Sequence, residues 1–173
     1  MDSASLTAAV VFVVGLLVRD GYELLKRSDR IDTKDVRVFA VVLTSMCIMW
    51  LSWFAVGVLT PARLQAPAVV RWAGAAAVLV GTAVAVGGMW QLGGVENIDH
   101  LVRTGLFSRI RHPMYLGFTL WILGWCVWMA APANLLLAPL GIASVLWWRQ
   151  LEESELALQY GDEFREYRAS TWF

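Results

Sequence analysis

The sequence predicts an all-α, polytopic membrane protein with about five transmembrane helices, the last two forming a helical hairpin that continues into a cytoplasmic C-terminal helix. Of its 173 residues, 58% are apolar and 16% are charged, which is far more apolar than an average soluble domain. The apolar residues fall into runs that are separated by polar segments. The chain has room for these spans, at roughly 20 residues each, and for little else, so no separate soluble domain is expected.

The first apolar run, Leu6 to Val18, is predicted to be a retained span and not a cleaved signal peptide. Asp2 precedes it where a signal peptide has basic residues, and Arg19-Asp20 follows where a cleavage site has small residues. The next segment, Arg19 to Arg37, carries charges of both signs. We expect it to form a hydrophilic loop.

The second and third runs are predicted to span from Val38 to Leu59 and from Trp72 to about Trp90. Thr60-Pro61 ends the second run. In the third run glycine recurs every seven residues, at Gly74, Gly81 and Gly88. Small residues at one face let helix backbones approach closely in lipid, so we expect this face to pack against another helix.

The segment from Gln91 to His112 is polar and is expected to lie outside the bilayer core. Two further runs follow, Met114 to Ala131 and Leu135 to Trp148, and only Pro132-Ala133-Asn134 separates them. A connection this short predicts an antiparallel helical hairpin. Pro139 would then fall near the first turn of the last span, where proline is tolerated.

The positive charges predict the orientation in the membrane. Of the 14 lysines and arginines, Arg63 and Arg71 would lie on one side of a protein with five spans, and the other twelve on the opposite side. The positive-inside rule then places the N-terminus outside and the C-terminus in the cytoplasm. The arginines outnumber the lysines twelve to two, which suggests a GC-rich genome and a bacterial cell membrane.

Two polar clusters border the hairpin, and both lie on the cytoplasmic side. The first surrounds Pro113, which favours a helix start and keeps His112 out of the α region. Arg109, Arg111 and His112 would therefore stand at a helix N-terminus, where an anionic group can dock. Arginines also flank membrane helices for simpler reasons, so this cluster alone leaves both interpretations open.

The second cluster, Arg149 to Glu155, follows the last span without a helix breaker. One continuous helix is therefore expected to carry it into the cytoplasm. Arg149 and Glu153 are four residues apart and share a helix face. By itself this pair also fits an ordinary surface ion pair, which contributes little to stability.

Taken together, the two clusters form a more specific sequence pattern than either cluster forms alone. Arg111-His112-Pro113-Met114-Tyr115-Leu116-Gly117 resembles the RHPxYxG region of the isoprenylcysteine carboxyl methyltransferase (ICMT) family. Glu152-Glu153, Leu156 and the segment from Tyr160 to Tyr167 resemble the C-terminal signature of that family. The resemblance covers roughly residues 90–168, and both motifs occur in the family's order.

The resemblance implies a membrane methyltransferase that uses S-adenosylmethionine and transfers a methyl group to a lipophilic acceptor. It implies that residues 1–90 face the acceptor and the lipid, and that residues 91–173 form the catalytic region. The implied cofactor-binding residues are Arg111, His112, Tyr115, Gly117 and Glu152. The implied catalytic residues are Arg149 and Glu153.

The chemistry of methyl transfer agrees with these assignments. A carboxylate acceptor needs only an orienting cation, and Arg149 could hold it through two nitrogens. A thiol, amine or phenol acceptor would need a base, and Glu153 with a raised pKa in a partly apolar pocket could serve. The sequence indicates the bilayer as a partner, no metal, no nucleic-acid partner and no particular oligomeric state.

Two other readings remain open. Membrane sterol reductases have a related C-terminal architecture and use NADPH, so a reductase is one alternative. A non-enzymatic packing subunit or small transporter is the other, but it gives no reason for two cytoplasmic polar motifs. The short chain and the pairing of RHPxYxG with the two glutamates favour methyl transfer.

Overall fold

The structure is a computed structural model that describes residues 2–28, 30–32, 35–93 and 100–173. Lys34 of the first loop and residues 94–99 of the polar segment lie outside these described residues. The prediction of an all-α protein is confirmed, because the regular structure of the described residues is helical apart from one isolated bridge between Ile110 and Trp172. The helices are α1 (Ser3–Arg27), α2 (Val36–Leu59), α3 (Ala68–Leu92), the short 3-10 helix η1 (Gly105–Ser108), α4 (Pro113–Met129), α5 (Pro132–Tyr160) and α6 (Asp162–Ser170).

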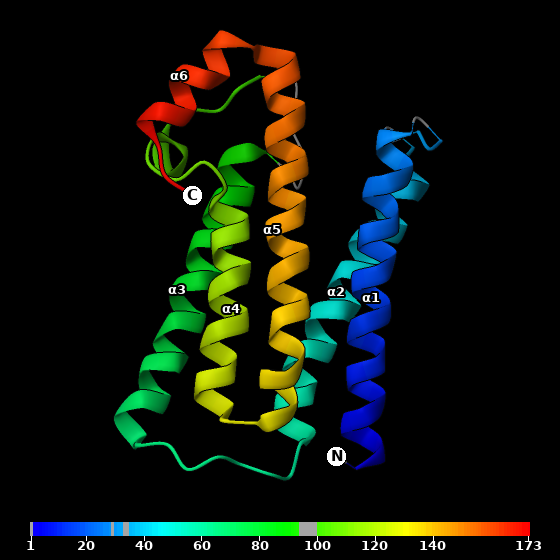
Figure 1. Ribbon diagram of the computed structural model, residues 1–173, viewed down its shortest axis with the longest axis vertical. Coiled ribbons are helices and arrows are strands. Elements are labelled where there is room, and N and C mark those ends of the chain that lie inside the picture. Colours follow the sequence, from blue (N-terminus) through cyan, green and yellow to red (C-terminus); the bar gives the residue numbers. More distant parts are fainter. Residues whose placement is uncertain (1, 29, 33–34, 94–99) are drawn as a thin grey trace.

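The five long helices run roughly along one direction, and α6 lies across the end of α3, α4 and α5 (Figure 1). Helices α3, α4 and α5 lie side by side, and α1 pairs with α2 (Figure 1). The connections from α2 to α3 and from α4 to α5 lie at the end opposite α6 (Figure 1). The predicted hairpin of the last two long helices is therefore present.

The core lies where α1 and α2 meet α4 and α5. Its fully buried side chains include Phe12 of α1 and Trp53 of α2, whose ring centroids are 5.0 Å apart. Ile122 of α4 and Val145 of α5 belong to the same cluster. These contacts hold the α1–α2 pair against the hairpin.

The outer faces of the helices are suited to lipid. By length and composition, α1, α2 and α3 can each cross a membrane, and α4 is a shorter apolar helix. Large apolar side chains such as Val69, Leu79 and Trp90 point outward and are exposed by 75%, 71% and 86%. Apolar surface on this scale is not tolerated in water, so the chain is an integral, multi-pass membrane protein.

The prediction of a hydrophilic loop from Arg19 to Arg37 is wrong for its first part. Helix α1 continues to Arg27, and both Arg19 and Glu23 are buried. The charged residues do not end the helix because they find partners inside the fold: Asp20 accepts hydrogen bonds from Trp148 Nε1 at 2.6 Å and from Ser144 Oγ at 3.3 Å.

The turn of the hairpin also differs from the prediction. Helix α5 begins at Pro132, and α4 ends where Ala130 adopts a left-handed conformation with φ of 49°. Pro139 consequently lies inside α5 and not in its first turn, because the helix begins three residues earlier than expected. The expectation that one helix carries the second cluster beyond the last span is confirmed, since α5 continues to Tyr160.

The glycine-rich face of α3 packs on α4, as the sequence predicted. A Cβ atom on Gly81 would come within 2.8 Å of the Gly117 carbonyl oxygen, and one on Gly117 would come within 2.5 Å of the Gly81 carbonyl oxygen. Gly74 meets the backbone of Gly124 and Trp128 in the same way. The two backbones therefore touch along this seam, and side chains are excluded from it.

We expect Gly81→Ala to destabilise the protein, because the added methyl group would force the α3 and α4 backbones apart. Overpacking costs about 1–3 kcal/mol, against a helix-propensity gain of up to about 1 kcal/mol. Gly21→Ala is the matched control, because a Cβ atom on this helical glycine meets nothing within 4 Å. Thermal unfolding in detergent should show a lower Tm for Gly81→Ala and an equal or higher Tm for Gly21→Ala. Equal Tm values for the two variants would contradict close backbone packing of α3 and α4 at Gly81.

Candidate active site

The start of α4 positions the first polar cluster. Pro113 is the first residue of the helix, and His112 before it lies outside the α region, with φ of −125° and ψ of 66°. The expectation that Pro113 keeps His112 out of the α region is confirmed. His112 and Arg111 are buried, with exposed fractions of 3% and 9%. Their side chains therefore point into the protein and not toward solvent.

Helix α5 brings the second cluster against the first. Glu153 Oε1 accepts hydrogen bonds from Arg111 Nε at 3.2 Å and from Arg149 Nη2 at 3.3 Å. The same oxygen lies 3.3 Å from His112 Nε2, and Glu153 Oε2 lies 3.6 Å from Arg168 Nε on α6. One buried carboxylate thus joins both sequence motifs and α6.

Glu152 faces the other nitrogen of the imidazole. Its Oε1 lies 3.7 Å from His112 Nδ1, and its side chain is 36% exposed. The Tyr115 ring centroid lies 5.7 Å from that of His112. The structure therefore brings together six of the seven residues that the sequence singled out, namely Arg111, His112, Tyr115, Arg149, Glu152 and Glu153.

Gly117 has a different position from these six. It lies on the face of α4 that packs on α3, within the glycine seam. A Cβ atom there would also approach the Ala85 Cβ to 2.6 Å. Close packing against α3 explains why residue 117 is a glycine. Its role in cofactor binding stays a prediction.

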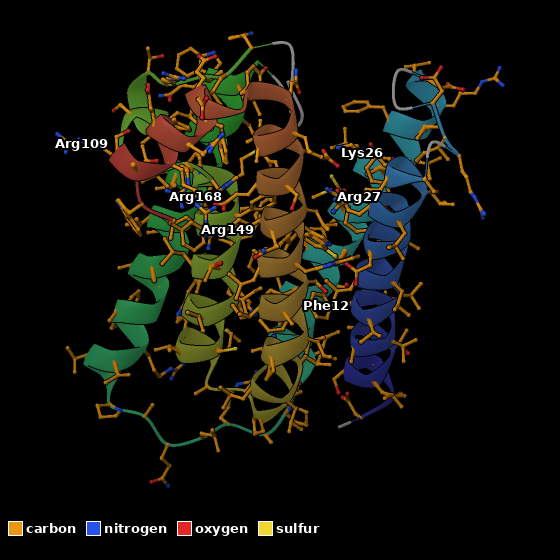
Figure 2. All side chains as sticks on the ribbon, turned by 45° about the horizontal axis from the view of Figure 1, so that its top comes forward. Phe12, Lys26, Arg27, Arg109, Arg149 and Arg168 are labelled. Atoms are coloured by element: carbon orange, nitrogen blue, oxygen red, sulfur yellow. The ribbon has the colours of Figure 1, made fainter. Side chains whose placement is uncertain are left out.

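A C-terminal strap, residues 171–173, crosses the first cluster and was not foreseen from the sequence. Arg111 Nη1 donates to the carbonyl oxygens of Arg168 at 3.1 Å and of Thr171 at 2.5 Å. The backbone nitrogen of Arg111 also donates to Trp172 O at 3.2 Å. The strap places the Phe173 ring 4.9 Å from the guanidinium carbon of Arg149. Figure 2 shows Arg149 and Arg168 on the α4 and α6 side of α5.

The charges of the cluster shift its pKa values. Burial lowers the pKa of His112, but contacts with the Glu152 and Glu153 carboxylates outweigh it, so the pKa of His112 is raised. The contact with His112 lowers the pKa of Glu153, burial raises it, and the positive charges of His112, Arg111 and Arg149 lower it further, to about 2. The sequence-based expectation of a raised pKa for Glu153 is therefore wrong, because three cations surround this carboxylate. An ionised, fully engaged carboxylate is a weak proton acceptor.

One buried polar atom in this cluster has no hydrogen bond among the described residues. His112 Nε2 is fully buried and lies close to Glu153 without hydrogen-bond geometry. Buried polar groups without a partner are uncommon and often mark sites that a ligand or water completes. The cluster thus has a polar atom available to a bound molecule.

A large apolar cavity of about 360 Å³ borders the cluster on the membrane side. Tyr115 of α4 and Arg19 of α1 are its two polar wall residues among those described. The remaining wall is apolar and is formed by Leu43, Met46, Cys47, Trp50, Leu51, Phe54, Met89, Met114, Phe118 and Trp121. A volume of this size falls in the range of small-molecule pockets, about 300–1,000 Å³.

A second, much smaller cavity of about 30 Å³ borders the cluster near α6. Arg111 and Glu152 are in its wall, together with Leu92, His100, Leu101, Val102, Phe107, Leu156 and Tyr167. The Tyr167 hydroxyl donates to the Phe107 carbonyl oxygen at 2.6 Å, which fixes α6 against the segment before α4. The polar cluster therefore separates a membrane-side cavity from a second, mixed polar and apolar one.

Charged residues of α1 also reach this region, although the sequence placed them in a loop. The Arg19 guanidinium pairs with Glu23 and lies 5.1 Å from the Trp148 ring centroid. Lys26 Nζ pairs with Glu155 at 3.2 Å. The helical spacing of Arg19 and Glu23 and the absence of proline from Arg19 to Arg37 were the available signals. Burial, which depends on contacts with α5, could not be predicted from that spacing.

Comparisons with known proteins support a relationship over the second part of the chain. The family described as phospholipid methyltransferase matches residues 69–163, which is more than half of the chain. Over an alignment of 79 residues, the chain is 37% identical to protein-S-isoprenylcysteine O-methyltransferase of Schizosaccharomyces pombe, and the alignment covers 42% of this chain and 32% of that protein. The chain thus aligns with about a third of the length of that relative. No solved structure matches the chain.

We expect Glu153→Gln to destabilise the protein strongly, because it leaves Arg111 and His112 buried without their anion. Removing one partner from a buried ion pair costs about 3–5 kcal/mol. Glu163→Gln is the matched control: Glu163 pairs with Arg103 at 2.7 Å but is 57% exposed, so its loss should cost less than about 1 kcal/mol. Thermal unfolding measures both, and a small loss of stability in Glu153→Gln would contradict the central role of Glu153.

The raised pKa of His112 predicts a pH dependence of stability. A raised pKa means that protonated His112 stabilises the fold fully below its ordinary value of 6.5, and that this contribution is lost as the pH rises through the raised value. The Tm of the wild type should therefore fall between pH 6.5 and 9 by more than that of His112→Gln. His100→Gln, which changes the chain's other histidine, should retain the wild-type decline. If the Tm of the wild type and of His112→Gln fell in parallel with rising pH, protonated His112 would not stabilise the fold.

Proposed function

The chain belongs to the phospholipid methyltransferase family, and from this we propose that it is a membrane methyltransferase that uses S-adenosylmethionine to methylate a lipophilic acceptor. The observation that carries the proposal is that Tyr115 is in the wall of the apolar cavity, Glu152 is in the wall of the small mixed cavity, and His112 contacts both residues. A transfer reaction needs two reactants to meet at one place. The polar cluster is that meeting place.

The side of the cluster near α6 is the proposed cofactor site. S-adenosylmethionine, when bound, supplies an electrophilic methyl group on a positively charged sulfur. Glu152 and Arg111 offer the charges that match its ammonium and carboxylate groups, and the apolar wall suits its adenine ring. His112 adjoins this wall, because its Nδ1 lies 3.7 Å from Glu152 Oε1. The residue types fit the cofactor, but the cavity of about 30 Å³ must open for a molecule of this size.

The membrane-side cavity is the proposed acceptor site. Its wall is contributed by α1, α2, α3 and α4 and is almost wholly apolar. Tyr115 is in this wall and also contacts the His112 ring, so the head of a bound lipophile would approach the cofactor side. We propose that Arg149, whose side chain is 26% exposed, orients the acceptor and that Glu153 holds Arg149 in place. This makes Glu153 a positioning residue and not a general base.

The membrane topology is part of the proposal. We propose five spans, with α4 and the first part of α5 crossing the bilayer as a hairpin, the N-terminus outside and α6 in the cytoplasm of a bacterial cell. The connection between α2 and α3, which contains Arg63, lies at the end opposite α6 (Figure 1), whereas Arg168 is on α6 and Arg103 pairs with Glu163 of α6. This distribution supports the orientation through the positive-inside rule.

The acceptor of the yeast relative, by its printed name, is an isoprenylcysteine in a protein. The sulfur-linked isoprenyl chain would fit an apolar cavity of about 360 Å³, and the cysteine carboxylate needs no base to accept a methyl group. A carboxylate-bearing lipophile is therefore the acceptor class that we propose. With a carboxylate acceptor, the ionised Glu153 is no obstacle, because the reaction needs no general base.

We expect the detergent-purified protein to bind S-adenosylhomocysteine saturably in calorimetry, and His112→Ala to weaken that binding by about ten-fold or more, since it removes a charge-coupled donor at the proposed site. NADPH serves as the comparison ligand. Binding of NADPH in place of S-adenosylhomocysteine would favour a reductase. Binding of neither ligand would favour a non-enzymatic role.

We expect Arg149→Lys to lower kcat by about ten-fold or more while S-adenosylhomocysteine binds within about two-fold of wild type, because lysine cannot hold a carboxylate through a planar fork. Arg165→Lys is the matched control, as Arg165 is 75% exposed on α6. Turnover with a soluble farnesylated cysteine derivative measures the effect. Full turnover in Arg149→Lys would contradict the orienting role and would indicate that Arg149 only anchors the helix at the membrane surface.

A further inference from the structure

The apolar cavity has one feature that its proposed use as an acceptor site does not explain. Arg19 is the only charged side chain among the described residues in its wall, and it is 4% exposed. A buried arginine in a membrane helix is costly and usually has a function. Arg19 lies on α1, outside the residues 69–163 that match the family.

The surroundings of Arg19 define one polar end of the cavity. Glu23, one helical turn away, pairs with the guanidinium, and the Trp148 and Tyr22 rings each lie 5.1 Å from it. Asp20 is turned toward α5, where Trp148 and Ser144 donate to it. Tyr115 is the other polar residue in the cavity wall. The cavity is therefore apolar along its length, with a cation and a phenol among its wall residues.

We propose that Arg19 determines acceptor specificity: it selects amphiphiles whose head group presents an anionic oxygen and rejects those that carry an ammonium group. A guanidinium donates hydrogen bonds and accepts none, so it can recognise only an acceptor atom. Glu23 balances the positive charge of Arg19 but is not in the described cavity wall, so a bound head group meets the guanidinium and not the carboxylate, which disfavours an ammonium. Electrostatic mismatch of this kind is a common basis of specificity. This inference rests on the proposed function in one respect: the selected amphiphile is a methyl acceptor only if the protein is a methyltransferase. The head-group preference itself is tested by binding alone.

The experiment uses the full chain in lipid nanodiscs and two matched probes, 12-bromododecanoate and 12-bromododecylamine. Bromine quenches tryptophan fluorescence at short range, and Trp50 and Trp121 are in the cavity wall. The wild type should bind the carboxylate at least about ten-fold more tightly than the amine. Equal affinities, or a preference for the amine, would overturn the proposal.

Variants separate recognition from folding. Arg19→Gln alone leaves Glu23 buried without its partner, so the double variant Arg19→Gln with Glu23→Gln keeps the pair neutral. We expect this double variant to bind both probes within about two-fold of each other. Arg27→Gln is the matched control, because Arg27 is on the same helix, is exposed and is not in the wall. A ten-fold preference that persists in the double variant would overturn the proposal.

A cavity-filling variant shows where the probes bind. Leu51 is in the cavity wall, so Leu51→Phe, which adds bulk without adding a tryptophan, should reduce quenching of Trp50 and Trp121 by both probes. Unreduced quenching would place the probes elsewhere and overturn the proposal. S-adenosylhomocysteine binding, measured on the same samples, distinguishes the two hypotheses. Its absence would remove the methyltransferase function, whereas a lost head-group preference with intact S-adenosylhomocysteine binding would remove only the role of Arg19.

Discussion

The carboxylate of Glu153 is the interaction on which the rest of the site depends. It is 9% exposed, and it joins Arg111 before α4, Arg149 on its own helix and Arg168 on α6. A buried anion is stable only when cations and donors surround it. Those partners come from three segments. The ion pairs of Glu153 therefore hold the start of α4, the end of α5 and α6 together. Arg111 extends that unit to the C-terminal strap through Thr171.

The bilayer imposes the second constraint. Backbone groups in lipid must be satisfied within helices, so the chemistry has to be built where helices end. The glycine seam brings α3 and α4 into backbone contact, and Tyr115, Phe118 and Trp121 of α4 line the large cavity. A polar reactant and an apolar one can thus reach the same residues from different sides. The arrangement follows from helix packing and needs no soluble domain.

The sequence predicted those features that local patterns determine. Hydrophobic runs indicated the long helices, the spacing of Gly74, Gly81 and Gly88 indicated the seam, and Pro113 indicated the start of α4. The sequence did not reveal features that depend on tertiary contacts. Arg19 and Glu23 are charged, and only their contacts with each other and with Trp148 make them part of a buried wall. The pKa of Glu153 was expected to rise through burial, but it falls because the cations on other segments outweigh burial. The strap at residues 171–173 has no motif at all.

We propose that a methyl group is transferred to a lipophilic carboxylate at the cluster around His112 and Glu153. The most direct measurement supplies tritium-labelled S-adenosylmethionine to the protein in nanodiscs with a farnesylated cysteine derivative and follows the label into the organic phase. Our account predicts label that mild base releases as volatile methanol, as a methyl ester requires, and no such label with His112→Ala. Organic label that withstands base, or no label above the His112→Ala background, would contradict the account.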